Sequence, residues 1–438
     1  MRSCRDHRID ALGGNMTDHS SKSGRGISRR GLLQGAAVTI GGSALAGAAA
    51  SPATAAATKP FIPSGLTYSA SDPLAGFFRK VAAGTATIVT AGDSITEAFG
   101  AASPQKGYPA RVRARLRNGA GQAPGGFDYV PARSQYATVD KPPTTVTYVS
   151  YTGANGAAID LRSATYAGAR STKSGLGRRA VALTGTGVRS ATFTQRCTSF
   201  VLSWRATSTR DAVSVAIDGT KVTLPAVSTG EQTWTSPKSA SAVRTVTVTW
   251  QSGEPFLEGW QLFDGDEGGG FHVLEASQST SRTEGFSLAS SAANGNDTWA
   301  DALRRFSPDL ITSMWGTNDY GVVTPAVLTQ QTVNYLDLVH DRSPDSALLV
   351  IMPYQLGKAS TTEWAKYRAA QQQAVTTFRS ANPGVAIGFF DLGAYVPPYF
   401  GQTGTTGNTY MYDGIHPNDT GYDVIAAILY AYLTSTPA

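Results

Sequence analysis

The chain has 438 residues, of which 41% are hydrophobic and 16% are charged, and its formal net charge is +6. This balance, with abundant Gly, Ser, Thr and Ala, predicts a β-rich globular protein with a large core and argues against a helical bundle. Seven basic and three acidic residues in positions 1–57 carry +4 of the charge, so the remainder keeps only +2. The pI of 9.2 therefore gives no support for a nucleic-acid partner.

The first 57 residues are predicted to be a twin-arginine-type signal peptide. Basic residues up to Arg29 and Arg30 precede an apolar run over 31–50, and small residues at 53–57 supply a cleavage site. Because the run is too mildly apolar for a stable membrane anchor, we expect cleavage and a secreted protein. Cys4 would leave with this leader, and Cys197 would then have no partner for an intrachain disulfide.

Next along the chain, the pattern predicts a helix over 72–81, a buried strand over 87–90 and an amphipathic helix over 109–117. The arginines of the last helix are expected to form a solvated face. We assign 58–147 to the first part of an α/β domain.

The segment 148–267 is predicted to be an inserted antiparallel β-sandwich. Residues 212–217 and 220–224 alternate around Asp218-Gly219, which is a hairpin pattern, and 243–250 alternates again. Further strands are expected over 198–204 and 255–263. The 177 residues between Ser94 and the next apolar strand at 271 greatly exceed the roughly 30 of a βαβ unit.

Helices and strands then alternate again, which predicts that 268–438 completes a parallel-sheet domain. The acidic, glycine-rich loop 264–270 lacks regular calcium-ligand spacing and is expected to be a connector. Strands are predicted over 271–276, 310–315, 347–352 and 385–390, and helices over 297–306 (capped by Asn296 or Asp297), 363–379 and 421–433.

Ser94 lies in Ala91–Thr96, directly after the first buried strand, at the sheet edge where open α/β folds bind ligands. A serine nucleophile needs a base, and past the leader the chain has only His272, His340 and His416. His340 is explained by its place at a helix carboxyl end, and His272 by a place in the core. His416 is the predicted base.

Two further polar groups complete the hypothesis. Asp413, three residues before His416 across a glycine-containing turn, is placed to fix the tautomer of the imidazole. Asn318 follows another apolar strand and can direct its side-chain NH2 at a developing oxyanion. Asp319 is expected to cap a helix.

Together, Gly92–Ser94, Gly316–Asp319 and Asp413–Pro417 resemble sequence blocks I, III and V of the SGNH (GDSL-type) hydrolases. The resemblance implies a flavodoxin-like three-layer α/β/α fold and acyl-ester hydrolysis without a metal or other cofactor. It implies a Ser94–His416–Asp413 triad, with the Ser94 N–H and Asn318 in the oxyanion hole. It also implies that the insertion is jelly-roll-like.

One block departs from the family pattern. Block II supplies a glycine N–H after the second strand, but here Ser277–Thr280 contains no glycine. Thr280 is our predicted donor, although a β-branched residue resists positive φ. Ser279, Gly285 and Gly295 stay open as alternatives. Ala98, where the family often has glycine, is a minor second departure.

These observations predict a secreted serine esterase that removes short acyl groups such as acetyl, with an acylated polysaccharide as a candidate substrate. The sandwich tryptophans Trp204, Trp234, Trp250 and Trp260 are candidates for stacking on sugars, although most are expected in the core. The alternatives are a longer-chain lipase and a non-catalytic glycan-binding protein on a hydrolase scaffold. A two-metal phosphoesterase is disfavoured, because three scattered histidines are too few.

Overall fold

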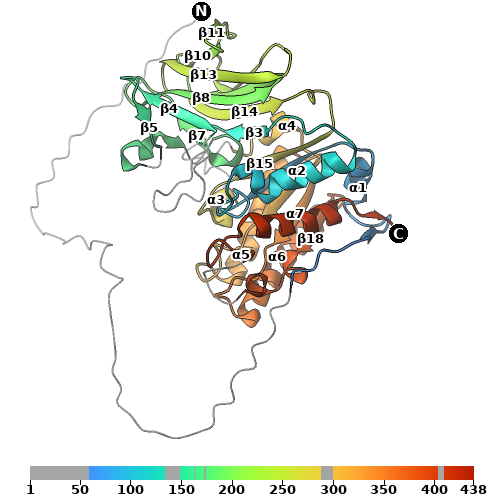
Figure 1. The fold of residues 1–438 in the computed structure, drawn as a ribbon. Helices are drawn as coiled ribbons and strands as arrows, with labels where there is room; N and C mark the ends of the chain where they lie inside the picture. Colours follow the sequence, from blue (N-terminus) through green and yellow to red (C-terminus); the bar gives the residue numbers. More distant parts are fainter. Residues whose placement is uncertain (1–58, 134–147, 162, 172–173, 288–298, 403–408) are drawn as a thin grey trace, which may run out of the picture. The chain divides into compact units, whose positions relative to one another are not determined.

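The computed structural model describes residues 59–133, 148–161, 163–171, 174–287, 299–402 and 409–438. The predicted leader lies outside these residues, as do Asn296, Asp297 and Gly295. The described chain consists of a parallel α/β domain and two antiparallel sheets inserted between its first two strands (Figure 1).

A five-stranded parallel sheet forms the centre of the α/β domain. Its strands are apolar along almost their whole length because helices cover both faces. The chain passes from β2 to β15 at one edge and then returns to β16 on the other side, so the switch point lies beside the carboxyl end of β2. The strand order is β15 (Phe271–Ser277), β2 (Ala86–Gly92), β16 (Leu310–Met314), β17 (Ala347–Met352) and β18 (Ile387–Asp391). This is the predicted flavodoxin-like order.

The helices divide between the two faces of this sheet, which gives the predicted α/β/α layers (Figure 1). Neighbouring strand residues face opposite layers: Ile88 packs with α1, α2 and α7, and Val89 packs with the other helices. The first layer is α1 (Ala75–Ala82), α2 (Tyr108–Gly119) and α7 (Asp419–Leu433). The second is α3 (Thr283–Ser287), α4 (Leu303–Phe306), α5 (Pro325–Arg342) and α6 (Thr361–Ala381).

The inserted sheets enclose a separate hydrophobic core, as the alternating strands predict. Phe193 of one sheet packs edge-on against Trp260 of the other, with ring centroids 4.9 Å apart. One sheet is β11 (Thr220–Val222), β10 (Ala212–Ile217), β13 (Ala242–Ser252), β8 (Val188–Cys197), β4 (Val149–Gly153) and β5 (Ala158–Ile159). The other is β12 (Gly230–Thr235), β9 (Ser199–Ala206), β14 (Phe256–Phe263), β7 (Ala180–Ala182) and β6 (Arg170–Ser171), with β3 (Asp128–Pro131) paired to β14.

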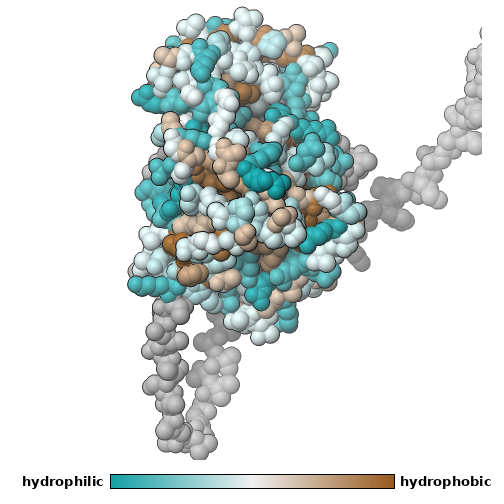
Figure 2. Space-filling view, turned by 90° about the vertical axis from the view of Figure 1, so that its right-hand side faces the viewer, coloured by the Kyte–Doolittle hydropathy of each residue, from teal (hydrophilic) through white to brown (hydrophobic). Residues whose placement is uncertain are grey.

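Small elements complete the described chain. They are the β1 (Thr67–Tyr68) and β19 (Thr436–Pro437) pair, and the 3-10 turns η1 (Pro104–Lys106), η2 (Ala164–Ala169), η3 (Leu176–Arg178), η4 (Leu392–Ala394) and η5 (Pro398–Gly401). On the face drawn in Figure 2, hydrophobic residues lie in several separate patches among polar ones. In the described part of the chain, every helix is too short or too polar to span a membrane.

Two local expectations were wrong. The helix predicted over 297–306 is only α4, because residues 299–302 form turns. The arginines of α2 do not all face solvent: Arg113 and Arg117 are buried and pair with Asp128 and Asp266. Helical periodicity cannot reveal such partners, because the two aspartates are supplied by distant segments of the chain.

Candidate active site

Ser94 lies in a tight turn at the carboxyl end of β2. A side chain at Gly92 would put its Cβ 2.0 Å from Thr96 Oγ1 and 3.1 Å from the carbonyl oxygen of Met314, so only glycine fits there. The N–H of Ile95 donates to Asp93 Oδ1 over 2.9 Å and closes the turn around the serine. The chain therefore holds the Ser94 hydroxyl at the switch point of the sheet.

His416 and Asp413 are brought to this hydroxyl by the loop before α7. The N–H of Tyr412 donates to the His416 carbonyl oxygen, and Asn418 caps α7, so both ends of the loop are fixed. Ser94 Oγ lies 2.9 Å from His416 Nε2, and His416 Nδ1 lies 2.9 Å from Asp413 Oδ2. The carboxylate can only accept, so Nδ1 carries the proton and Nε2 accepts from the serine. The three predicted residues form one hydrogen-bonded chain.

Phe99 is a contact that the motifs did not reveal. Its ring centroid lies 4.4 Å from that of His416, and its backbone N–H donates to the Ser94 carbonyl oxygen over 2.9 Å. Tyr412 packs edge-on against the Phe99 ring. Phe99 thus links the serine turn to the histidine loop by packing.

The loop after β15 lies next to the serine turn, because the N–H of Gln278 donates to the Gly92 carbonyl oxygen over 3.1 Å. Asn318 Nδ2 donates to the Ser281 carbonyl oxygen over 2.9 Å, which ties the third predicted segment to the same loop. The second proton of this NH2 group points away from the Ser281 carbonyl oxygen. Ser94, Thr280 and Asn318 therefore lie on three segments of the chain that are joined to one another by hydrogen bonds.

The alternatives to Thr280 can now be compared. The Ser279 N–H donates to the Glu97 carboxylate, so it is already occupied. Gly285 lies within α3, and Gly295 falls outside the described residues. Thr280 is exposed, has φ 68°, and its N–H finds no acceptor among the described residues. The chain thus gives a threonine the left-handed backbone that glycine adopts freely. Ala98, the other departure, also has positive φ, 66°.

Two buried carboxyl groups, those of Asp319 and Asp93, lie next to the predicted site residues Asn318 and Ser94 in the chain. Asp319 accepts from the N–H and the hydroxyl of Thr283, the first residue of α3, and from the N–H of Gly316, so it fixes the Asn318 turn. The helix that follows Asp319, α5, is capped by Thr324. Burial raises the pKa of Asp319, against these hydrogen bonds. Burial also raises the pKa of Asp93 to about 7; the Ile95 N–H opposes this shift, and the nearby Asp319 adds to it.

With this geometry established, comparison with known proteins gives one family. The GDSL-like Lipase/Acylhydrolase family matches residues 258–424, a range that contains Asn318, Asp413 and His416. Residues 258–424 of this chain are thus similar to the GDSL-like lipase/acylhydrolase (SGNH) family. Ser94 precedes the matched range because the sandwich separates it from the rest of the α/β domain.

A solved structure with a TM-score above 0.5 supports the same fold for this chain. A peptidoglycan O-acetylesterase is 17% identical, with a TM-score of 0.54, and the match covers 84% of this chain and 96% of that one. A family two carbohydrate esterase from Cellvibrio japonicus is 12% identical, covers 70% and 96%, and has a TM-score of 0.28. A search of curated proteins found no match.

The other two histidines among the described residues lie away from Ser94. His340 is in the last turn of α5, against Phe378, and His272 is buried in β15. Asp128, Asp266 and His272 place possible metal-ligand atoms within 4.8 Å of one another. The Arg117 guanidinium, however, pairs with Asp266 over 2.9 Å, and His272 Nδ1 lies 2.8 Å from Asp128. Protein groups already satisfy this cluster, which argues for a structural role.

The sandwich tryptophans have unequal exposure. Trp204 and Trp260 are buried, so they cannot stack on a sugar. Trp234 and Trp250 are partly exposed, but the Arg189 guanidinium lies over the Trp250 ring at 5.7 Å. Of the four tryptophans, Trp234 is therefore the better candidate for stacking on a sugar.

Proposed function

We propose that this protein is a serine esterase that removes short acyl groups, such as acetyl, from a glycan. The observation that carries the proposal is the chain of hydrogen bonds from Ser94 through His416 to Asp413. Its order matches a nucleophile, a general base and a group that orients the base. The N–H groups of Ser94 and Thr280 and the NH2 of Asn318 would be the oxyanion donors.

In the proposed mechanism, Ser94 Oγ attacks the acyl carbonyl carbon while its proton passes to His416 Nε2. The carbonyl oxygen becomes an oxyanion, stabilised by the three donors. When the tetrahedral intermediate collapses, the ester C–O bond breaks and the leaving alcohol takes the proton from His416. Water, deprotonated by His416, then attacks the acyl-Ser94 ester and releases the carboxylic acid and the free serine.

The preference for a short acyl group on a glycan is a finer proposal. It is supported by the similarity to a solved structure described as a peptidoglycan O-acetylesterase. The basic and apolar leader supports secretion, which would bring the enzyme to polymers outside the cell. The competing hypothesis is a lipase that acts on esters of longer acyl chains.

The test compares p-nitrophenyl acetate, butyrate and octanoate with O-acetylated peptidoglycan and acetylated xylan. We expect the acetyl substrates to be preferred, and Ser94→Ala to lose about 10³-fold or more in kcat. Treatment with EDTA is expected to leave the activity unchanged. Activity that survives in Ser94→Ala would contradict the mechanism, and a preference for octanoate would favour the lipase.

A further inference from the structure

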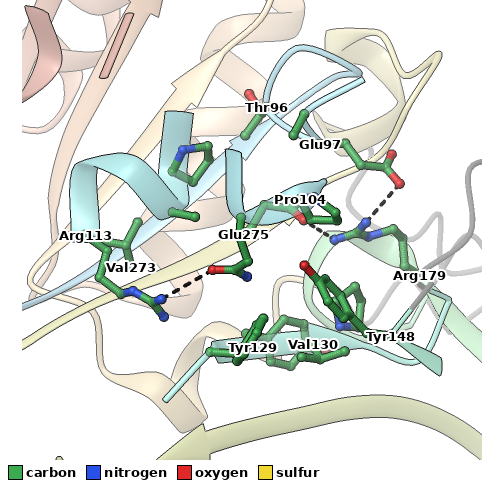
Figure 3. Close-up of a pocket in the computed structure, with 16 residues that line it drawn as sticks. Thr96, Glu97, Pro104, Arg113, Tyr129, Val130, Tyr148, Arg179, Val273 and Glu275 are labelled. Atoms are coloured by element: carbon green, nitrogen blue, oxygen red, sulfur yellow. Dashed lines mark hydrogen bonds and ion pairs between the residues drawn. The ribbon is translucent and has the colours of Figure 1, made fainter. Parts of the chain in front are cut away.

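Arg179, which belongs to the inserted segment, contacts two carboxylates of the α/β domain. Arg179 directly precedes β7, and its side chain is only 4% exposed. Nη1 lies 2.9 Å from Oε1 of Glu97, which follows Ser94 by three residues, and Nη2 pairs with Glu275 of β15. Figure 3 shows the guanidinium pointing toward Glu97 at one side of the pocket that adjoins the serine turn. One buried cation thus joins the serine turn, β15 and the sandwich.

The same two carboxylates hold the backbone of the loop after β15. Glu275 Oε1 accepts from the N–H of Ser277 over 2.8 Å, and Oε2 of Glu97 accepts from the N–H of Ser279. The N–H between them, from Gln278, donates to the Gly92 carbonyl oxygen. Three successive N–H groups are therefore directed at fixed acceptors, and the next one along the chain belongs to Thr280.

We propose that Arg179 is a positioning residue that holds the loop 277–280 so that the Thr280 N–H faces the substrate oxyanion. This inference rests on the proposed esterase function. The sandwich is then a structural part of the active site, in addition to any role in binding. Nothing in blocks I, III or V indicates this, because the residue lies in the insertion.

The physical reason lies in the charges. Glu97 and Glu275 both form ion pairs with the same buried guanidinium. An unpaired charge beside such a buried group is costly. Burial raises the pKa of Glu275, and Arg179 opposes that shift. Without the guanidinium the two carboxylates repel each other and one of them takes up a proton or moves. Either change loosens an acceptor of the 277–279 backbone. A misplacement of about 1 Å at a catalytic donor costs on the order of 100-fold in rate.

The experiment compares Arg179→Gln and Arg179→Lys with the control Arg205→Gln. Arg205 is also a sandwich arginine that faces several carboxylates, at 3.4 Å from Glu231, 3.8 Å from Glu258 and 3.7 Å from Asp301. None of these belongs to the serine turn or to the 277–280 loop. The control therefore removes a similar charged contact without touching the proposed oxyanion loop.

With p-nitrophenyl acetate, we expect Arg179→Gln to lower kcat by about 10- to 100-fold while KM changes less than about threefold. Arg179→Lys should recover part of kcat, because an ammonium still neutralises the carboxylates. Arg205→Gln should keep the wild-type kcat. All assays are run below the melting temperature of each variant, so that a loss of kcat is not a loss of folded protein.

The proposal is overturned if folded Arg179→Gln keeps the wild-type kcat, or if Arg205→Gln loses as much. If Arg179→Gln does not fold, Glu97→Gln decides, because Arg179 and Ser279 donate to different oxygens of Glu97 and one of these two positions becomes an NH2 group, which cannot accept. An unchanged kcat in Glu97→Gln would then overturn the proposal. Failure of the esterase function itself would look different, as an inactive wild type or an active Ser94→Ala.

Discussion

His416 Nδ1 lies 2.9 Å from Asp413 Oδ2, while Nε2 of the same ring lies 2.9 Å from Ser94 Oγ. The Asp413 carboxylate also accepts the backbone N–H groups of Ile415 and His416, each over 2.7 Å. Burial alone would raise the pKa of Asp413, but the imidazole and these N–H groups lower it to about 2. Asp413 is therefore ionised at any pH at which the enzyme would work.

Asp413→Asn tests the role of this charge. A neutral amide cannot stabilise the imidazolium that forms when Ser94 loses its proton, and its NH2 favours the wrong tautomer. We expect kcat for p-nitrophenyl acetate to fall by about 10²- to 10⁴-fold with little change in KM. The variant should fold, since Oδ1 still accepts from the backbone. A kcat near the wild-type value would show that the carboxylate is only structural.

The same pair predicts the pH dependence of the reaction. A protonated imidazole cannot accept the Ser94 proton, so kcat/KM should fall as the pH falls. Asp413, with its pKa of about 2, stays ionised over that range and does not cause the loss. A kcat/KM that stays constant as the pH falls would contradict the role of the imidazole as the base.

Asp93→Asn should change how stability depends on pH. The pKa of Asp93 rises from 3.8 unfolded to about 7 folded, so its favourable contribution is complete below about pH 4 and is lost as the pH rises through 7. The amount lost is of the order of a few kcal/mol. We therefore expect wild-type Tm to fall more between pH 5 and pH 8 than the Tm of Asp93→Asn. Parallel Tm curves for the two proteins would contradict the shifted pKa.

Only part of the site follows from patterns in the sequence. The strand-end positions of Ser94 and Asn318 follow from short apolar runs, and the choice of His416 follows from the small number of histidines. Arg179 could not be found in this way, since Glu97 lies 82 residues away and neither residue stands in a pattern. Buried charge pairs between distant segments leave no periodic signal. This limit also explains the wrong expectation for Arg113 and Arg117.

Thr280→Gly separates the backbone of this residue from its side chain. Thr280 has φ 68°, a conformation that costs a side-chain-bearing residue about 1–2 kcal/mol. Glycine removes that strain but gives the unfolded chain more freedom, so stability should change by less than about 1 kcal/mol. The N–H remains, so kcat should stay within about threefold of wild type. A tenfold loss of kcat would show that the threonine side chain itself contributes.

Gly100→Ala tests the contact between the serine turn and the histidine loop. A Cβ at Gly100 would lie 2.5 Å from the Pro417 carbonyl oxygen and 3.3 Å from His416 Cβ, so the histidine loop would have to move. We expect kcat to fall by about 10- to 100-fold, because His416 would no longer meet Ser94 correctly. The matched control is Gly230→Ala: its φ of +100° is close to the +96° of Gly100, and no atom lies within 4 Å of the added Cβ. Both variants should lose roughly 1–3 kcal/mol of stability through backbone strain, but only Gly100→Ala should lose kcat. Equal kcat in the two variants would mean that the histidine loop tolerates the clash.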